Sequence, residues 1–77
     1  MAHKVIVYST PTCPWCVRAK EYFTSINQPF QDVNVAEDQA AAQEMIDKSG
    51  QLGVPVIDID GKIIVGFDRV AIDQALK

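Results

Sequence analysis

Both cysteines of the chain, Cys13 and Cys16, lie in the tetrapeptide Cys13-Pro14-Trp15-Cys16, which follows a short apolar run at residues 5–8. A helical pattern of apolar residues begins directly after the first cysteine. Two cysteines that are three positions apart share one face of a helix, so their sulfur atoms can meet. The spacing therefore predicts thiol–disulfide chemistry at the start of a helix.

The two cysteines are expected to have different roles. Cys13 lies where unpaired backbone N–H groups and the positive end of the helix dipole favour a thiolate over a thiol. Cys16 is followed at helical spacing by Ala19, Phe23 and Ile26, which predicts that its side chain faces the core with them. We therefore expect the Cys13 thiolate to attack a substrate disulfide. Cys16 then attacks the mixed disulfide and releases the reduced substrate.

Two other interpretations of the cysteine pair compete with a redox role. Cys-x-x-Cys is half of a common zinc site, but a structural zinc needs four ligands, and the one histidine, His3, lies at the other end of the first apolar run. A permanent structural disulfide would close a very short loop, and disulfide stabilisation decreases as the loop shortens. The sequence favours redox chemistry over both.

Length and composition predict one small domain covering residues 1–77. The chain is 48% hydrophobic and has only 4 Gly and 4 Pro, which favours a packed globule over disorder. A net charge of −3 with scattered Lys and Arg argues against nucleic acid or an anionic membrane as the principal partner. The first apolar run is too short for a signal peptide or a membrane span. We therefore expect a cytosolic protein, in which a close cysteine pair is more often catalytic than structural.

The apolar pattern around the cysteines predicts a strand, a helix and a second strand. Residues 4–8 form a nearly continuous β-branched run, typical of a central strand that is covered on both faces. Pro14 suits a first helical turn, and the helix is predicted to run to about Ile26. After a break, apolar residues at 30–35 indicate a second strand, which a right-handed crossover makes parallel to the first.

The second half of the chain predicts a helix, a hairpin and a last helix. Residues 37–49 form the predicted helix, with Gly50 as its stop and with inward positions at Ala41, Ala42, Met45 and Ile46. Residues 51–53 are predicted to be a loop. Strands at residues 54–59 and 62–65 flank Asp60-Gly61, a strong signal for a two-residue hairpin. Asp68 is predicted to cap the last helix, and the full order is βαβαββα.

This order resembles the glutaredoxin branch of the thioredoxin fold over essentially the whole chain, with Cys13-Pro14-Trp15-Cys16 after the first strand and Gly53-Val54-Pro55 before the third. Residues 8–17, Tyr-Ser-Thr-Pro-Thr-Cys-Pro-Trp-Cys-Val, are similar to small bacterial glutaredoxin-like proteins. The resemblance implies an α/β thioredoxin-like fold with a four-stranded mixed sheet and helices on both faces. In that fold the first strand pairs with both the second and the third.

The resemblance also implies a cis peptide bond before Pro55. Such a bond would place the loop beside Cys13 and turn the backbone of Val54 toward an extended peptide or glutathione. In the family, the region of Gly66, Phe67 and Asp68 receives one end of glutathione. Phe67 suits an alternative role equally well, as packing at the base of the last helix.

The chain departs from the glutathione-binding pattern of the family at several positions. Thr10 stands where a typical glutaredoxin has a lysine that meets a glutathione carboxylate, and Gly53 replaces a threonine. The pair Gly66-Phe67 is instead similar to the Ser-Gly-Phe stretch of glutaredoxin-like proteins that are recharged by thioredoxin reductase and supply ribonucleotide reductase. By resemblance, the chain lies between the two types.

Two further residues complete the predicted site. Trp15 is expected to be exposed as a flat apolar platform for a partner protein, with partial packing over the helix as the alternative. Thr12 is predicted to cap the helix that begins at the cysteines. Arg18 and Lys20 are expected to be solvated and are given no catalytic role. No general base for Cys16 is visible in the sequence.

The sequence and the resemblance together predict a monomeric thiol–disulfide oxidoreductase without a bound cofactor. Its substrates would be protein disulfides or glutathione mixed disulfides, and its electrons would come from glutathione or from NADPH through thioredoxin reductase. A second hypothesis is an iron–sulfur carrier, in which Cys13 of two chains and two glutathione thiols hold a [2Fe–2S] cluster. The proline after Cys13 counts against it, because cluster-binding members more often resemble a Cys-Gly start.

Overall fold

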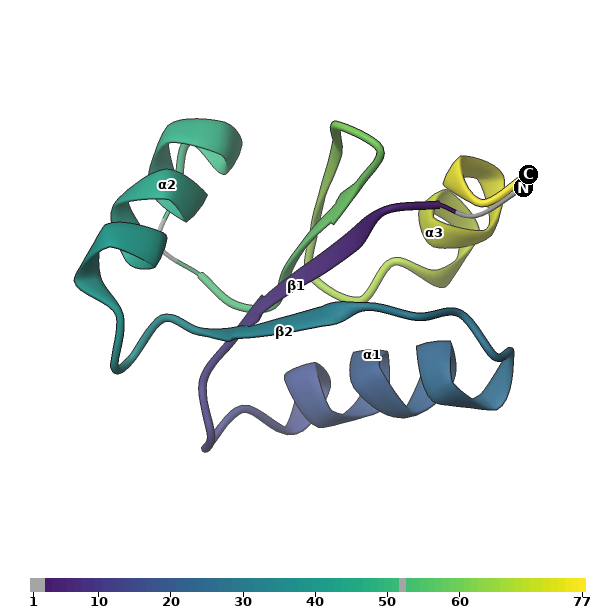
Figure 1. Cartoon of the computed structure of the whole chain (residues 1–77), viewed down its shortest axis with the longest axis horizontal. Coiled ribbons are helices and arrows are strands. Elements are labelled where there is room, and N and C mark those ends of the chain that lie inside the picture. The colour runs from purple at the N-terminus through teal and green to yellow at the C-terminus, as the bar shows by residue number, and fades with distance from the viewer. Residues whose placement is uncertain (1–2, 52) are drawn as a thin grey trace.

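The computed structural model describes residues 3–51 and 53–77. Leu52, in the predicted loop at residues 51–53, lies outside the described residues. The described elements follow the predicted order βαβαββα (Figure 1): β1 Val5–Ser9, α1 Pro14–Ser25, β2 Gln31–Asn34, α2 Gln39–Ser49, β3 Val56–Ile59, β4 Lys62–Val65 and α3 Arg69–Ala75.

The four strands form one mixed sheet in the order β2-β1-β3-β4. Strand β1 is parallel to β2 and antiparallel to β3, and β3 is antiparallel to β4. The prediction that the first strand pairs with both the second and the third is therefore confirmed. A strand with neighbours on both sides and apolar side chains on both faces is buried almost completely, as Val7 and Tyr8 are.

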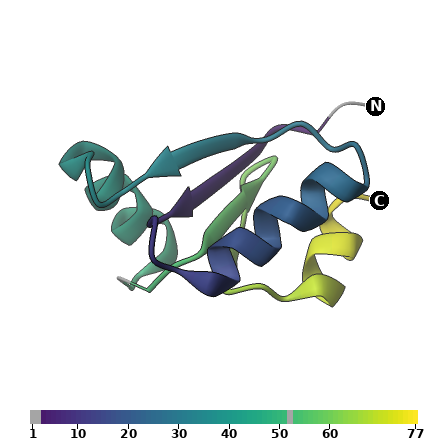
Figure 2. The ribbon, with the colours of Figure 1, turned by 90° about the horizontal axis from the view of Figure 1, so that it is seen from below.

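Helices cover both faces of the sheet, as predicted. Alternate residues of β1 point to opposite faces, so Val7 packs with Phe23 of α1 and Ile72 of α3, whereas Tyr8 packs with Met45 of α2. Figure 2 shows α1 and α3 side by side, with α2 at the other side of the sheet. The site at the start of α1 thus rests on a core that two helices share with the sheet.

Several predicted boundaries shift by one or two residues. The first helix ends at Ser25, and Ile26 is its C-cap with a 42% exposed side chain, so the prediction that Ile26 faces the core is wrong. The chain turns away there, because Asn27 has a φ of 58°. The third strand begins at Val56 rather than at residue 54. Helix α2 begins at Gln39, after the N-cap Asp38.

The hairpin between β3 and β4 is confirmed. Asp60 and Gly61 both have positive φ, 53° and 92°, as a type I′ turn requires. The Asp60 carboxylate accepts the Lys4 N–H at 2.8 Å and is paired with His3. This turn and His3 lie at the end of β1 opposite to the cysteines, because β1 runs from Val5 near the turn to Ser9.

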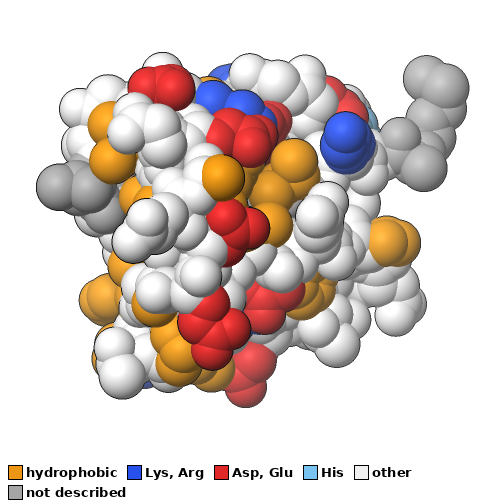
Figure 3. All heavy atoms as spheres, turned by 60° about the vertical axis from the view of Figure 1, so that its left-hand side comes forward, with side chains coloured by type: hydrophobic (Ala, Val, Ile, Leu, Met, Phe, Trp, Pro, Cys, Tyr) orange, Lys and Arg blue, Asp and Glu red, His pale blue; other side chains and the backbone are white. Residues whose placement is uncertain are grey.

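The surface on the α2 side carries acidic side chains among hydrophobic and uncharged ones where the described residues form it (Figure 3). In Figure 3, acidic side chains are spread over most of this face, and the basic side chains gather in its upper part. Within residues 3–51 and 53–77, no helix combines the length and the apolar character that crossing a membrane requires.

One charged group is built into the α2 face of the sheet. Lys48 Nζ donates to Asp58 Oδ2 at 2.8 Å and to the Tyr8 hydroxyl at 2.9 Å, and it lies 3.0 Å from Glu44 Oε1. Asp58 is buried, and its other oxygen accepts the Gly61 N–H at 2.8 Å. The hydrogen bond to Asp58, followed by that to Tyr8, raises the pKa of Lys48. Asp58 is therefore a paired structural charge.

We expect Lys48→Met to lower the free energy of unfolding by about 2–3 kcal/mol, because it leaves the Asp58 carboxylate buried without its cation. The raised pKa of Lys48 means that this contribution is present at pH 7 and declines as the pH rises above about 10.4. Urea unfolding measures the change. Lys62→Met, at an exposed position of β4, removes the same charge and should change stability by less than about 0.5 kcal/mol. Equal effects of the two variants would contradict the buried-pair interpretation.

Candidate active site

Cys13 is the N-cap of α1. Its backbone is extended, with φ −93° and ψ 110°, and its Sγ accepts the Cys16 N–H at 3.2 Å. Pro14 follows in the first helical turn, where its missing N–H costs nothing. The prediction that Thr12 caps this helix is wrong. The helix begins at Pro14, so the cap position falls on Cys13, and Thr12 is an exposed residue before it.

Cys16 is the inner of the two sulfurs, as predicted. It is fully buried, together with Ala19 and Phe23 on the same helix face, whereas Cys13 is half-buried, and both are free thiols. Burial, followed by the side-chain hydrogen bond with Cys13, raises the pKa of Cys16 to about 11. The backbone of Thr10 and the charge of Lys20 act in the opposite direction. Cys16 is therefore a thiol at neutral pH, and it is shielded from solvent.

The loop before β3 lies beside Cys13. The Val54–Pro55 peptide bond is cis, as the resemblance implied, and the Val54 carbonyl oxygen is 3.8 Å from Cys13 Sγ. Pro55 is buried, and its carbonyl accepts the Gly66 N–H at 2.8 Å. That hydrogen bond ties the segment after β4 to the loop, so three segments that are distant in sequence meet next to the cysteine.

A groove of about 270 Å³ opens at this meeting point. Five of the predicted site residues line it: Trp15, Val54, Pro55, Gly66 and Phe67. Trp15 is 57% exposed, which confirms its predicted exposure. The walls are mostly apolar. The arrangement suits an extended, partly apolar segment that carries a disulfide to Cys13.

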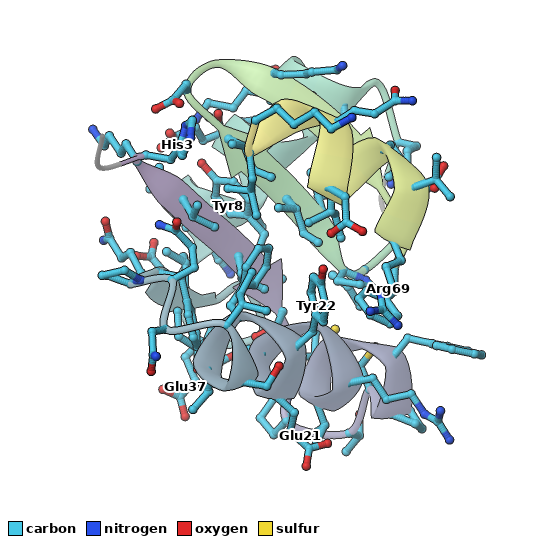
Figure 4. All side chains as sticks on the ribbon, turned by 90° about the vertical axis from the view of Figure 1, so that its right-hand side faces the viewer. His3, Tyr8, Glu21, Tyr22, Glu37 and Arg69 are labelled. Carbon is cyan, nitrogen blue, oxygen red and sulfur yellow. The ribbon has the colours of Figure 1, made fainter. Side chains whose placement is uncertain are left out.

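Phe67 both lines the groove and packs on the core. Its ring meets the Tyr22 ring edge-on with centroids 5.9 Å apart, and it contacts the core cluster between the sheet, α1 and α3. Figure 4 shows Tyr22 rising from α1 toward α3, with Arg69 beside it; the Arg69 guanidinium carbon lies 4.8 Å from the ring centroid. The predicted packing role of Phe67 is thus present alongside its place in the groove.

Asp68 caps α3, as predicted, by accepting the Ala71 N–H at 3.1 Å. Its carboxylate is therefore engaged by the helix backbone. Among the described residues, neither Asp68 nor Thr12 is part of the groove lining.

Two cations near the cysteines have partners that the sequence interpretation missed. Arg18, expected to be only solvated, stacks on Trp15 with its guanidinium carbon 5.2 Å from the ring centroid. Lys20 donates to Asp32 and to Ser9. Two sequence spacings could have indicated these neighbours, because residues three or four apart lie side by side on a helix. Arg18 is three residues after Trp15, and Lys20 is four residues after Cys16. The approach of Ser9 to Asp32 depends on strand pairing, which local sequence does not reveal.

Within the described ranges, no cluster of three or more His, Cys, Asp or Glu side chains has an arrangement that could hold a metal ion. His3, the histidine considered above as a zinc ligand, hydrogen-bonds Asp60 at the far end of β1.

Comparison with known proteins identifies the family. The family model described as Glutaredoxin matches residues 5–64, which span β1 to β4 and include both cysteines and the cis-proline loop. The chain belongs to the glutaredoxin family. This is a family of thiol–disulfide oxidoreductases, in agreement with the chemistry predicted from the cysteine spacing.

Individual glutaredoxin relatives cover most of the chain. An uncharacterized glutaredoxin-like 8.6 kDa protein in the rubredoxin operon of Clostridium pasteurianum is 56% identical over 71 residues, covering 92% of this chain and 95% of its own. Glutaredoxin 3 of Escherichia coli (strain K12) is 41% identical over 64 residues, covering 83% and 77%. The crystal structure of the thioredoxin-like protein BC3987 superposes with a TM-score of 0.86 at 30% identity, covering 92% and 97%. The predicted thioredoxin-like fold is thereby confirmed.

The difference between the two thiols predicts selective alkylation. Iodoacetamide added to the reduced, folded protein at pH 7 should modify Cys13 and leave Cys16 free, because Cys16 is buried and its pKa is raised to about 11. Peptide mass spectrometry locates the label. Denaturant should make both cysteines reactive, and Cys13→Ser should not be labelled when folded. Comparable labelling of Cys16 in the folded protein would contradict the assigned roles.

Proposed function

We propose that this protein reduces protein disulfides or glutathione mixed disulfides by cycling Cys13 and Cys16 between dithiol and disulfide. The observation that carries the proposal is the pairing of a half-buried sulfur at the helix N-cap, 3.8 Å from the Val54 carbonyl, with a fully buried second sulfur behind it. In this proposal the protein is a single-domain monomer that works in the cytosol without a bound cofactor.

The reaction has two steps. Cys13 Sγ attacks one sulfur of the substrate disulfide, and the other substrate sulfur leaves as a thiolate and takes up a proton. Cys16 then loses its proton and attacks Cys13 Sγ, which forms the Cys13–Cys16 disulfide and releases the second substrate sulfur. Oxidation of the two cysteines balances reduction of the substrate by two electrons. With a glutathione mixed disulfide, free glutathione can replace Cys16 in the second step.

Substrate docking in this proposal uses the groove beside Cys13. Its lining of Trp15, Phe67 and the Val54–Pro55 loop favours a segment that pairs with backbone and buries apolar side chains. The exposed Trp15 ring extends this surface outward, where a partner protein can pack on it.

The lining also favours a protein over glutathione as the source of electrons. A lysine that would meet a glutathione carboxylate is replaced by Thr10, and the carboxylate of Asp68 is occupied by the start of α3. A mostly apolar groove that Phe67 helps to line contributes packing area rather than charge. We therefore propose thioredoxin reductase, supplied by NADPH, as the recharging partner.

Two serine variants test the catalytic assignment. Cys13→Ser should show no turnover of either substrate class above the rate without protein, because it removes the nucleophile. Cys16→Ser should lose the reduction of protein disulfides and keep turnover of glutathione mixed disulfides when glutathione is present. Assays with insulin and with a glutathionylated peptide separate the two activities. Retained activity of Cys13→Ser would refute the assignment of the nucleophile.

The reductant is tested by following Trp15 fluorescence while the oxidised protein is reduced. Thioredoxin reductase with NADPH should reduce it quickly, and glutathione should reduce it slowly. Fast reduction by glutathione alone would overturn the proposed partner, while the thiol–disulfide activity itself would stand.

Thr10→Lys should increase the rate of reduction by glutathione about ten-fold, since a charge-assisted hydrogen bond to a carboxylate contributes about 1.5–3 kcal/mol. The same assay with thioredoxin reductase is the internal control and should change little. An unchanged glutathione rate would mean that the missing lysine is not what limits glutathione binding.

A further inference from the structure

Three polar side chains from three elements meet close to the buried cysteine. Lys20 of α1 donates from Nζ to Asp32 Oδ2 of β2 at 3.1 Å and to Ser9 Oγ of β1 at 3.4 Å. Ser9 itself is 3% exposed and donates to Asp32 Oδ1 at 2.9 Å. The ammonium group is therefore tethered by two partners at the carboxyl end of the central strand.

Lys20 lies one helical turn beyond Cys16 on the same face of α1, so the two side chains are neighbours. On its other side, Cys16 has the backbone of Thr10, which follows Ser9 in the chain. Burial and Cys13 both raise the pKa of Cys16, whereas Thr10 and Lys20 lower it. The two groups that lower the pKa of Cys16 are thus the backbone just after β1 and the lysine tethered at that end of the strand.

The other charges near this region have partners of their own. Lys48 is bound to Asp58 and Tyr8 on the opposite face of the sheet, and the Val54 segment adds only neutral groups. Helix α3 and its N-cap carry three charged side chains, which contact the Ala71 N–H, the Tyr22 ring and the Tyr22 hydroxyl: Asp68, Arg69 and Asp73. Arg18 stacks outward on Trp15.

We propose that Lys20, tethered by Asp32 and Ser9, is a positioning residue that favours the Cys16 thiolate and thereby sets the rate of the resolving step. The inference rests on the proposed function and extends it to the half of the reaction for which the sequence shows no general base. Lys20 does not take the proton. Its ammonium stabilises the negative charge that remains on Cys16.

The step is balanced as follows. The Cys16 proton passes through solvent to the departing substrate thiolate, and the Cys16 electron pair forms the bond to Cys13 Sγ. The bond between Cys13 and the substrate sulfur breaks, and that sulfur leaves with the bonding pair. The positive charge of Lys20 lowers the free energy of removing the proton from Cys16, and Lys20 keeps its own proton throughout.

The direct test is the pKa of Cys16, followed by the ¹³Cβ chemical shift in NMR spectra of the Cys13→Ser protein. Adding Lys20→Met should raise this pKa by about half a pH unit, because Asp32 offsets part of the lysine charge. Lys20→Arg should leave it nearly unchanged, because the charge is kept. Lys62→Met is the matched control, since it removes an exposed lysine on β4, and it should have no effect.

The second test is the rate of the resolving step in the protein with both cysteines, measured by rapid-mixing release of thiol from a substrate disulfide. Lys20→Met should slow it about two-fold at pH 7, because the roughly threefold loss of thiolate is partly offset by greater nucleophilicity. The attack of Cys13, measured in Cys16→Ser, should not change. If Lys20→Met fails to fold, as judged by circular dichroism, Lys20→Gln replaces it with the same expectations.

An unchanged Cys16 pKa, or an equal change in Lys62→Met, would overturn the proposal. A uniform slowing of both chemical steps, without a pKa change, would assign Lys20 a purely structural role and would also overturn it. Neither result bears on whether the parent protein reduces disulfides, since the parent's turnover is measured separately. The NMR titration needs no reductase or substrate.

Discussion

The rest of the structure depends on the burial of β1 on both faces. Its side chains point alternately to the α1–α3 layer and to the α2 layer, so neither face of the strand can move without opening a core. The carboxyl end of such a strand is a rigid anchor for whatever follows it. Here the following residues are a short loop and Cys13, so the position of the nucleophile is fixed by a strand that is almost completely buried.

Local signals in the sequence were sufficient for the order of elements and for which of the two cysteines is buried. The Asp60-Gly61 turn and the Asp68 cap each have a chemical signature within a few residues, and both are present in the structure. The inward direction of Cys16 followed from helical spacing alone. The cis bond before Pro55 came from family resemblance, because general statistics for a proline bond would have favoured trans.

The features that the sequence did not predict depend on tertiary contacts or, for the cap of α1, on an uncommon capping residue. Thr12 is a common capping residue type, yet a sulfur one position later holds the cap, because Pro14 fixes the first helical turn. The tether on Lys20 needs the register between β1 and β2, which places Asp32 opposite Val7 and lets its carboxylate reach Ser9 at the end of the central strand. The edge-on contact of Phe67 with Tyr22 likewise joins two segments whose proximity only the packed fold creates.

The sulfur that caps α1 is also the sulfur that is oxidised, so helix capping and the redox couple are thermodynamically linked. In the dithiol, Cys13 Sγ accepts the Cys16 N–H at 3.2 Å. A Cys13 thiolate accepts this N–H more strongly than a disulfide sulfur, which carries no charge, so the cap stabilises the reduced state when Cys13 is ionised. Stabilising the reduced state makes the oxidised state a readier electron acceptor. The first turn of the helix thus raises the midpoint potential of the couple, independent of which partner delivers the electrons.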